Sequence, residues 1–289
     1  MHGDRDPGTY YRFDAANNAL QTISRVYPSL AERELAPMRE VNYRAADGTP
    51  IPAYLTVPPN RAGAGPAVLL PHGGPAARDY WSYDFLAQFL AANGYAVLQS
   101  NYRGSAGYGR AWAGDGGFRG WRRAVDDIRD GARYLVEAGI AAPDEICIVG
   151  WSYGGYAALM SSIEDPAAYR CAVSIAGVTD PRALGRAMRN FVGGLEAQTF
   201  IGTDDDVTKA GSPLERAEEL AVPVLLVHPR KDINVPFQQS ADLFRALRRA
   251  DKAVDFVEYE HAEHSIIPER YRKDLLTRLA AFLETHIGE

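Results

Sequence analysis

The stretch Ile146–Tyr156 reads ICIVGWSYGGY and holds the pattern G-x-S-x-G around Ser152. The apolar run before it predicts a strand, and the small and apolar residues after it predict the start of a helix. A strand, a sharp turn and a helix are the context in which this pattern presents a nucleophilic serine. Gly150 and Gly154 suit such a turn because they carry no Cβ that would clash there. The alternative is a glycine-rich turn with a structural serine, which the flanking elements disfavour.

Strands and helices alternate along most of the chain. Apolar runs predict strands at 67–71, 96–100, 146–149, 171–175, 222–227 and 256–259, and helical spacing or capping signals predict helices at 80–93, 121–138, 156–162, 238–249 and 269–286. Strands that are apolar on both faces and separated by helices are typical of a mostly parallel central sheet with helices on both faces. We therefore predict an α/β fold, with the chemistry at the carboxyl ends of the strands.

The first 40 residues follow a different pattern. Residues 8–14 and 20–26 read as strands joined by a turn at Asn17-Asn18, and 28–37 read as an irregular or helical linker. An isolated hairpin is marginal in water, so we expect it to pack against something else. A second hairpin, with Asp47-Gly48 between 41–44 and 51–57, opens the next region. We predict an N-terminal extension over 1–40 and a catalytic domain over 41–289.

A serine nucleophile needs an imidazole within reach and an acid to orient it, in the chain order Ser, acid, His for this kind of turn. His261 and His264 both follow the predicted strand 256–259, and order alone leaves either as the base. Asp232 lies just beyond the strand 222–227 and is the candidate acid. Its rivals at 204–206 form a charge run, which is usually a solvated face.

The developing oxyanion needs two hydrogen-bond donors. One is expected from the backbone N–H of Tyr153, which follows the nucleophile. The other is expected from the strand-end loop His72-Gly73-Gly74-Pro75, whose glycines allow close backbone approach. His72 precedes the nucleophile, against the usual order for a base, so we read it as a residue that structures the loop.

Several separate motifs together resemble the catalytic domain of the prolyl oligopeptidase family of serine peptidases, and most closely its acylaminoacyl-peptidase-like branch. The resembling segments run from about residue 41 to the end: 72–75 (HGGP), 101–109 (NYRGSAGYG), 150–155 (GWSYGG), Ser212-Pro213, and His264 with Pro268-Glu269-Arg270. The resemblance implies an α/β-hydrolase fold, His264 as the catalytic histidine, and oxyanion donors at Gly74 (or Gly73) and Tyr153.

The chain also departs from the family pattern. The acid loop carries Pro229 where the family usually has glycine, and Glu263 stands where glycine usually precedes the histidine. Family members typically carry an N-terminal β-propeller that gates the site, and the hairpin at 8–26 looks like a remnant of a final blade. The paired acidic residues that bind a free amino terminus in the dipeptidyl branch have no visible counterpart.

We therefore predict a serine hydrolase that cleaves peptide or acyl-peptide bonds through a Ser152–Asp232–His264 triad and an acyl-enzyme. One alternative is a carboxylesterase that acts on small esters with the same triad, and another is a non-catalytic fragment or assembly module. We expect 181–211 to be the least regular late stretch and to cap the site. The candidate substrate-binding residues are Trp151, Phe191, Phe200 and Val235.

Composition excludes several other classes. Lys and Arg number 31 against 37 Asp and Glu, a net charge of −6 that offers no footprint for nucleic acid. No apolar run approaches the length of a membrane span, and no signal peptide is visible, so we expect a cytoplasmic protein. Cys147 and Cys171 lie in apolar strands and are expected to be reduced thiols. We expect no cofactor and no metal, while the free hairpin edge would favour a homo-oligomer.

Overall fold

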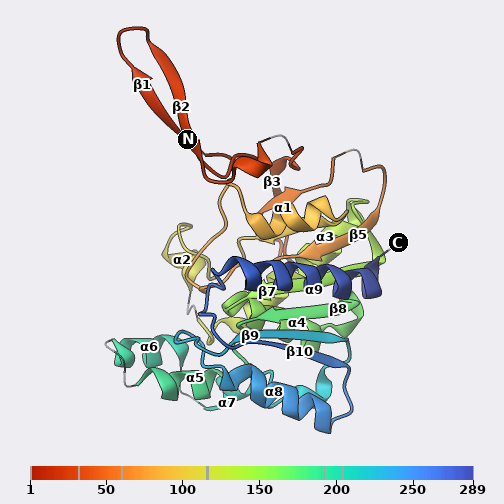
Figure 1. Ribbon diagram of the computed structural model, residues 1–289. Coiled ribbons are helices and arrows are strands. Elements are labelled where there is room, and N and C mark those ends of the chain that lie inside the picture. Colours follow the sequence, from red (N-terminus) through yellow and green to blue (C-terminus); the bar gives the residue numbers. More distant parts are fainter. Residues whose placement is uncertain are drawn as a thin grey trace.

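The computed structural model describes residues 2–31, 33–59, 61–114, 117–189, 191, 193–202 and 205–288, without the side chains of residues 197, 200 and 205. Its main body is an eight-stranded sheet in the order β10-β9-β8-β7-β5-β6-β4-β3 (Figure 1). The strands are β3 Met38–Arg44, β4 Pro50–Thr56, β5 Gly65–Leu69, β6 Ala96–Ser100, β7 Ala141–Trp151, β8 Cys171–Ile175, β9 Val224–Pro229 and β10 Val254–Tyr259. Among these eight strands, β4 alone runs antiparallel to the rest. The predicted α/β class, with a mostly parallel sheet, is confirmed.

Helices cover both faces of this sheet. One core packs the sheet against α3 (Trp121–Glu137), α4 (Tyr153–Glu164) and α8 (Gln238–Arg249), and the other packs it against α1 (Phe85–Ala92) and α9 (Glu269–Ile287). Along β7, Ile146 and Ile148 belong to the first core, whereas Cys147 and Val149 belong to the second. This alternation follows from the two-residue period of a strand and explains why the strand is apolar throughout.

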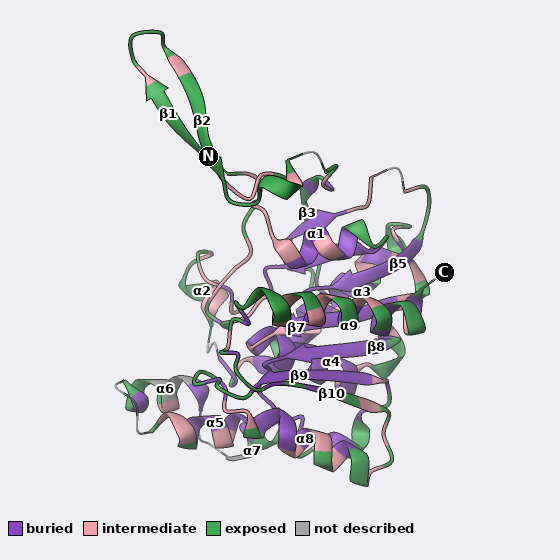
Figure 2. Cartoon of the chain, viewed as in Figure 1, coloured by how far each residue is buried: buried purple, intermediate pink, exposed green. Residues whose placement is uncertain are grey.

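Two hairpins precede the parallel strands. β1 (Thr9–Asp14) and β2 (Ala19–Arg25) form a separate two-stranded sheet, and Asn18 takes a positive φ of 47° in the predicted turn. This hairpin projects from the body, and Figure 2 shows it as almost wholly exposed. Phe13 and Ile23 are 60% and 67% exposed. Most of its side chains are thus exposed in this chain, and the expectation that the hairpin packs against something else stays a prediction.

The base of the hairpin is nevertheless attached firmly to the body. Asp4 Oδ2 accepts the backbone N–H of Met38 at 2.9 Å. Gln88 on α1 donates to the carbonyl oxygens of Ala36 and Asp4 at 2.8 and 3.2 Å. These groups are buried, so the hydrogen bonds hold the segments that flank the hairpin on the helix.

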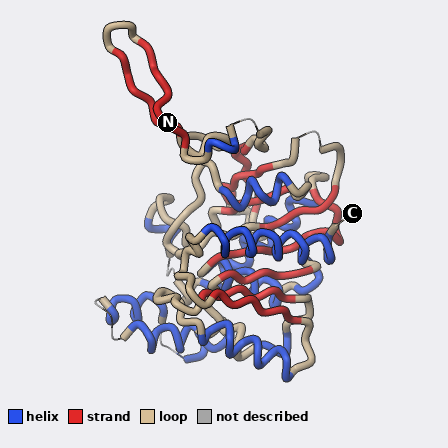
Figure 3. Tube along the Cα trace, viewed as in Figure 1, coloured by secondary structure: helices blue, strands red, loops and turns tan. Residues whose placement is uncertain are grey.

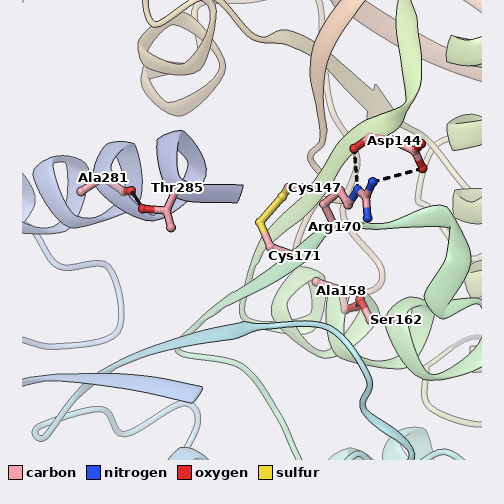
Figure 4. The surroundings of a disulfide bond; sticks show 8 residues. All are labelled: Asp144, Cys147, Ala158, Ser162, Arg170, Cys171, Ala281 and Thr285. Carbon is pink, nitrogen blue, oxygen red and sulfur yellow. Dashed lines mark hydrogen bonds and ion pairs between the residues drawn. A yellow bond between two sulfur atoms is a disulfide. The ribbon is translucent and has the colours of Figure 1, made fainter. Parts of the chain in front are cut away.

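The prediction of two reduced cysteines is wrong. Cys147 on β7 and Cys171 on β8 are register partners on neighbouring parallel strands, with Cα atoms 4.8 Å apart, and form a disulfide (Figure 4). Both side chains face the core that contains α9, and both are fully buried. Their pairing depends on strand order and register, which the sequence does not show directly.

The stretch 181–211 is more regular than expected. It holds the short helices α5 (Pro181–Met188), α6 (Gly194–Ile201) and α7 (Asp205–Ala210), which Figure 3 shows beside one end of the sheet. Pro181 begins α5, and the Asp180 carboxylate caps it by accepting the N–H of Arg182 at 2.9 Å. Short remaining elements are α2 (Arg110–Ala113) and the 3₁₀ turns Pro28–Leu30, Pro166–Ala168 and Ala217–Glu219.

Candidate active site

Ser152 occupies the turn between β7 and α4. Its φ of 60° and ψ of −121° lie in a region that L-residues rarely adopt. A Cβ at Gly150 would lie 2.1 Å from the Gly154 carbonyl oxygen, and one at Gly154 would lie 2.1 Å from that of Pro71. Both glycines are therefore required for the turn to close. The N-terminus of α4 begins directly behind the serine, and its dipole favours negative charge there.

His264 and Asp232 meet on loops beyond β10 and β9. His264 Nδ1 lies 2.6 Å from Asp232 Oδ2. A carboxylate accepts, so Nδ1 carries the proton and Nε2 is left free to take one. His261, which chain order left open as the base, is exposed to solvent. The structure thus brings His264, and not His261, to the candidate acid.

Asp232 is held as an anion. Its Oδ1 accepts the backbone N–H groups of Asn234 and Val235, each at 2.9 Å. Burial alone would raise the pKa of Asp232, but hydrogen bonds from His228, His264 and Val235 outweigh it and hold the pKa well below its usual range. A carboxylate charged at neutral pH can orient the imidazole and stabilise its protonated form.

Sequence reasoning missed His228, near the end of β9. This fully buried imidazole lies 2.9 Å from the Val235 carbonyl oxygen through Nε2 and 2.7 Å from Ser240 Oγ through Nδ1. Nε2 must donate to the carbonyl, and it also lies 3.5 Å from Asp232 Oδ2. His228 therefore holds the loop that carries Asp232 through its contact with the Val235 carbonyl oxygen. The sequence feature that could have identified this residue is its place four residues before Asp232, at the end of an apolar strand.

Ser152 and His264 line the same cleft, of about 310 Å³. Gly74, Tyr153 and Asn234 also line it, and the rest of its wall is apolar: Phe118, Val178, Leu184, Met188, Ile201 and Val235. Three of these side chains come from α5 and α6, the region expected to cap the site. An apolar wall beside a nucleophile can hold an apolar side chain of a substrate.

The predicted pocket residues are distributed differently. Val235 lines the cleft, whereas Trp151 lies outside its lining and donates Nε1–H to the His264 carbonyl oxygen at 3.0 Å. Phe191 is 52% exposed and does not line the cleft. The side chain of Phe200 lies outside the described residues. Sequence reasoning missed Leu184 and Met188, whose four-residue spacing along α5 places them on one helix face.

Metal-binding clusters and membrane-spanning helices are both absent from the described residues. No group of three or more His, Cys, Asp or Glu side chains in that part of the chain is arranged to hold a metal ion. None of the helices described there is long and apolar enough to cross a membrane.

Comparison with known proteins gives the family. The model of the prolyl oligopeptidase family matches residues 81–289, well over half of the sequence. The chain belongs to this family. The predicted family and α/β-hydrolase fold are confirmed, and the relatives' names support the predicted class, a serine peptidase.

Relatives of this peptidase-family chain match almost all of it. Dipeptidyl aminopeptidase BIII of Pseudoxanthomonas mexicana is 31% identical over 98% of the chain and 43% of its own length. The acylamino-acid-releasing enzyme of Homo sapiens is 24% identical over 86% of the chain and 35% of its own length. The chain therefore spans less than half the length of these relatives.

Solved structures show the same fold. A puromycin-hydrolyzing peptidase of Mycobacterium tuberculosis superposes with a TM-score of 0.87 at 27% identity, over 99% of this chain and 45% of that one. The acylaminoacyl peptidase of Pyrococcus horikoshii superposes with a TM-score of 0.86 at 21% identity, over 100% of this chain and 48% of that one.

Proposed function

We propose that this chain carries the catalytic machinery of a serine peptidase that cleaves peptide or acyl-peptide bonds. Ser152 attacks the carbonyl carbon, and His264 Nε2 takes the serine proton and returns it to the leaving amine. Asp232 orients His264 and stabilises its charged form. Water, activated in turn by His264, then hydrolyses the acyl-enzyme. The observation that carries the proposal is the 2.6 Å contact between His264 Nδ1 and Asp232 Oδ2 at the cleft that Ser152 lines.

The oxyanion of the tetrahedral intermediate is assigned to two backbone donors. The N–H of Tyr153 is the first of α4 and has no partner within that helix, as is usual for a helix N-terminus. Gly74 lines the cleft opposite, and its φ of 124° suits only glycine. Two such donors stabilise the transition state more than the substrate, because the charge develops only there.

The cleft favours an apolar side chain on the acyl side of the scissile bond. Leu184, Met188 and Val235 contribute to its wall, and none of its described lining residues carries a carboxylate. A free amino terminus therefore finds no counter-charge among them, and an N-acylated substrate suits this part of the chain better. The whole protein of a relative contains much more chain, which can supply amine recognition there.

The test compares initial rates on a short p-nitrophenyl ester and on N-acetyl-aminoacyl anilides with Ala or Phe at the acyl position. We expect anilide turnover, a preference for Phe over Ala of about 10-fold or more, and a loss of about 10⁴-fold or more in Ser152→Ala. Ser24→Ala, on the exposed hairpin, is the matched control. Ester turnover without anilide turnover would make the carboxylesterase the better assignment. Unchanged anilide turnover in Ser152→Ala would refute the proposal.

Domain organisation and self-association belong to the same proposal. We divide the chain into an extension over about 1–40 and a catalytic domain over 41–289, and since the first strand of the large sheet begins at Met38, the boundary belongs a few residues earlier. The hairpin offers free strand edges and exposed apolar side chains, and both favour pairing with a second copy. Sedimentation at micromolar concentration tests this, and a purely monomeric profile would contradict it.

A cytoplasmic location stays a prediction. The disulfide between Cys147 and Cys171 weighs against it, because such bonds persist mainly in oxidising compartments. Mass measurement of the protein alkylated in denaturant, with and without prior reduction, would count the free thiols directly, because both cysteines are buried in the folded chain.

A further inference from the structure

His72 lies between the end of β5 and the glycines of the cleft, yet it takes no part in the proposed proton transfers. Both of its ring nitrogens already have partners. Nδ1 lies 2.7 Å from the Gly73 carbonyl oxygen, and Nε2 lies 2.7 Å from Ser105 Oγ. A histidine whose two ring nitrogens both have partners is held in one orientation, and its place beside the cleft suggests that this orientation serves the site.

The protonation state of His72 follows from these partners. A carbonyl oxygen can only accept, so Nδ1 carries the proton and donates to Gly73. Burial lowers the pKa of His72 to about 4, so the ring is neutral near neutral pH and Nε2 accepts the Ser105 hydroxyl. The Ser105 hydroxyl also lies 2.7 Å from the Tyr102 carbonyl oxygen, a second possible acceptor for its single proton. That oxygen already accepts the backbone N–H of Ser105 and the Nε1–H of Trp112, whereas Nε2 of the Nδ1-protonated ring has no other donor within these contacts, so we assign the hydroxyl proton to Nε2.

Tyr102 keeps the imidazole in its plane. The two rings stack with centroids 4.3 Å apart and an interplanar angle of 12°. The Tyr102 hydroxyl also donates to the His72 carbonyl oxygen at 2.8 Å. Tyr102 is fully buried, so the ring on which the imidazole stacks is held in place by the surrounding core. The direction of the Nδ1–H bond is therefore set by the fold.

Holding the Gly73 carbonyl also sets the direction of the next N–H. The peptide bond between Gly73 and Gly74 is trans, and in a trans peptide the C=O and N–H bonds point to opposite sides. A Cβ at Gly73 would lie 3.1 Å from the Trp151 carbonyl oxygen and 3.5 Å from Ser152 Cβ, so this peptide runs beside the nucleophile. Two successive glycines would otherwise leave the peptide plane free to rotate.

We propose that His72 is a positioning residue that aims the Gly74 N–H at the oxyanion through the Gly73 carbonyl, with Ser105 holding the imidazole in the required tautomer. The inference rests on the proposed function, in which Gly74 is an oxyanion donor. Loss of the clamp would let the Gly73–Gly74 peptide turn its carbonyl toward the cleft, which would remove a donor and place an acceptor beside the developing negative charge.

Three substitutions of His72 distinguish the contribution of Nδ1 from that of Nε2. His72→Asn places an amide near the Nδ1 position, His72→Gln places one near the Nε2 position, and His72→Phe keeps only the stacked ring. We expect kcat on the anilide to fall about 10²-fold in the Gln and Phe variants with KM little changed, and the Asn variant to recover most of it. His261→Asn, at an exposed histidine, is the matched control and should retain wild-type kcat.

A second measurement keeps the test decisive if a variant is poorly folded. A peptidyl trifluoromethyl ketone forms an oxyanion adduct with the serine, whereas a fluorophosphonate reports that the serine is reactive. We expect the Gln and Phe variants to lose affinity for the ketone in proportion to kcat, and the Asn variant to keep it. Wild-type kcat in His72→Phe, or an equal fall in all three variants, would overturn the assignment to Nδ1. Unchanged turnover in Ser152→Ala would instead refute the proposed function itself.

Discussion

The two hairpins of this chain have similar local signals and opposite surroundings. β1–β2 turns at Asn18 and places Phe13 opposite Leu20, both more than half exposed. β3–β4 turns at Asp47-Gly48, and its Ile51 and Leu55 are fully buried. The second hairpin is buried because β4 also pairs with β6 and joins a sheet that helices cover on both faces. A turn and an apolar pattern thus specify a hairpin, while its neighbours decide whether it is buried.

The largest expected contrast is catalytic, since the account places all chemistry at the strand ends of the embedded sheet. His264→Ala should lower kcat by about 10⁴-fold, because the serine loses its base. His261→Ala, three residues earlier and exposed, should stay within about 2-fold of wild type. Steady-state rates on the acyl anilide measure both. Equal losses would show that the base has been misassigned.

A leucine in each hairpin gives a matched comparison of stability. Leu55→Ala should lower the free energy of unfolding by about 2–5 kcal/mol, because it leaves a cavity in a core without solvent. Leu20→Ala should change it by less than about 0.5 kcal/mol, since the side chain is already in water. Denaturant unfolding at a protein concentration at which the chain is monomeric measures both. A large loss in Leu20→Ala under that condition would show that another part of the chain covers the hairpin.

Two aspartates extend the comparison to pH. Burial, with Asp84 nearby, raises the pKa of Asp79 to about 8, so folding retains a proton that the unfolded chain releases near pH 4. Stability should therefore fall as pH rises between those values, by up to about 1.4 kcal/mol per pH unit, and Asp79→Asn should flatten that slope.

Asp14, on the exposed hairpin, is the control for this titration. Hydrogen bonds from Asn17 and Ala16 lower its pKa, so it is charged throughout the same range in the folded protein. Asp14→Asn should leave the slope of thermal stability against pH unchanged. An identical slope in wild type and Asp79→Asn would mean that Asp79 is ionised in the folded protein.

The smallest effect is expected from removing the exposed hairpin. Replacing residues 10–24 with a short glycine-serine linker should keep kcat/KM on small acyl anilides within about 2-fold, because none of these residues lines the cleft. The melting temperature of the monomer should also change little, because the side chains of residues 10–24 are mostly exposed. A loss of activity beyond about 10-fold would show that the hairpin shapes the site.

Local backbone requirements made much of the site predictable. Gly150 and Gly154 indicate the sharp turn at Ser152, because a Cβ at either position would clash with the backbone. The chain order Ser, acid, His then predicts an acid and a histidine beyond later strands. Order alone did not separate His261 from His264, and the family resemblance did. The α/β class followed from strands that are apolar on both faces.

Features that depend on distant packing were not predictable. The Cys147–Cys171 disulfide needs β7 and β8 to be neighbours in one particular register. Half of the apolar wall comes from α5 and α6, whose position over the cleft is a property of the fold. Phe191 is aromatic and close in sequence to that wall, yet it faces solvent. Phe191 lies in the connection between α5 and α6, and residue type and position in sequence do not say which way such a side chain points.

Labelling with a fluorophosphonate, followed by peptide mapping, is the sharpest test of Ser152 as the nucleophile, because it reports the activated serine without assuming a substrate. We expect one adduct, on Ser152, whose formation slows by about 10³-fold or more in His264→Ala while His261→Ala reacts like wild type. An adduct on another serine, or none on the folded wild-type protein, would contradict it.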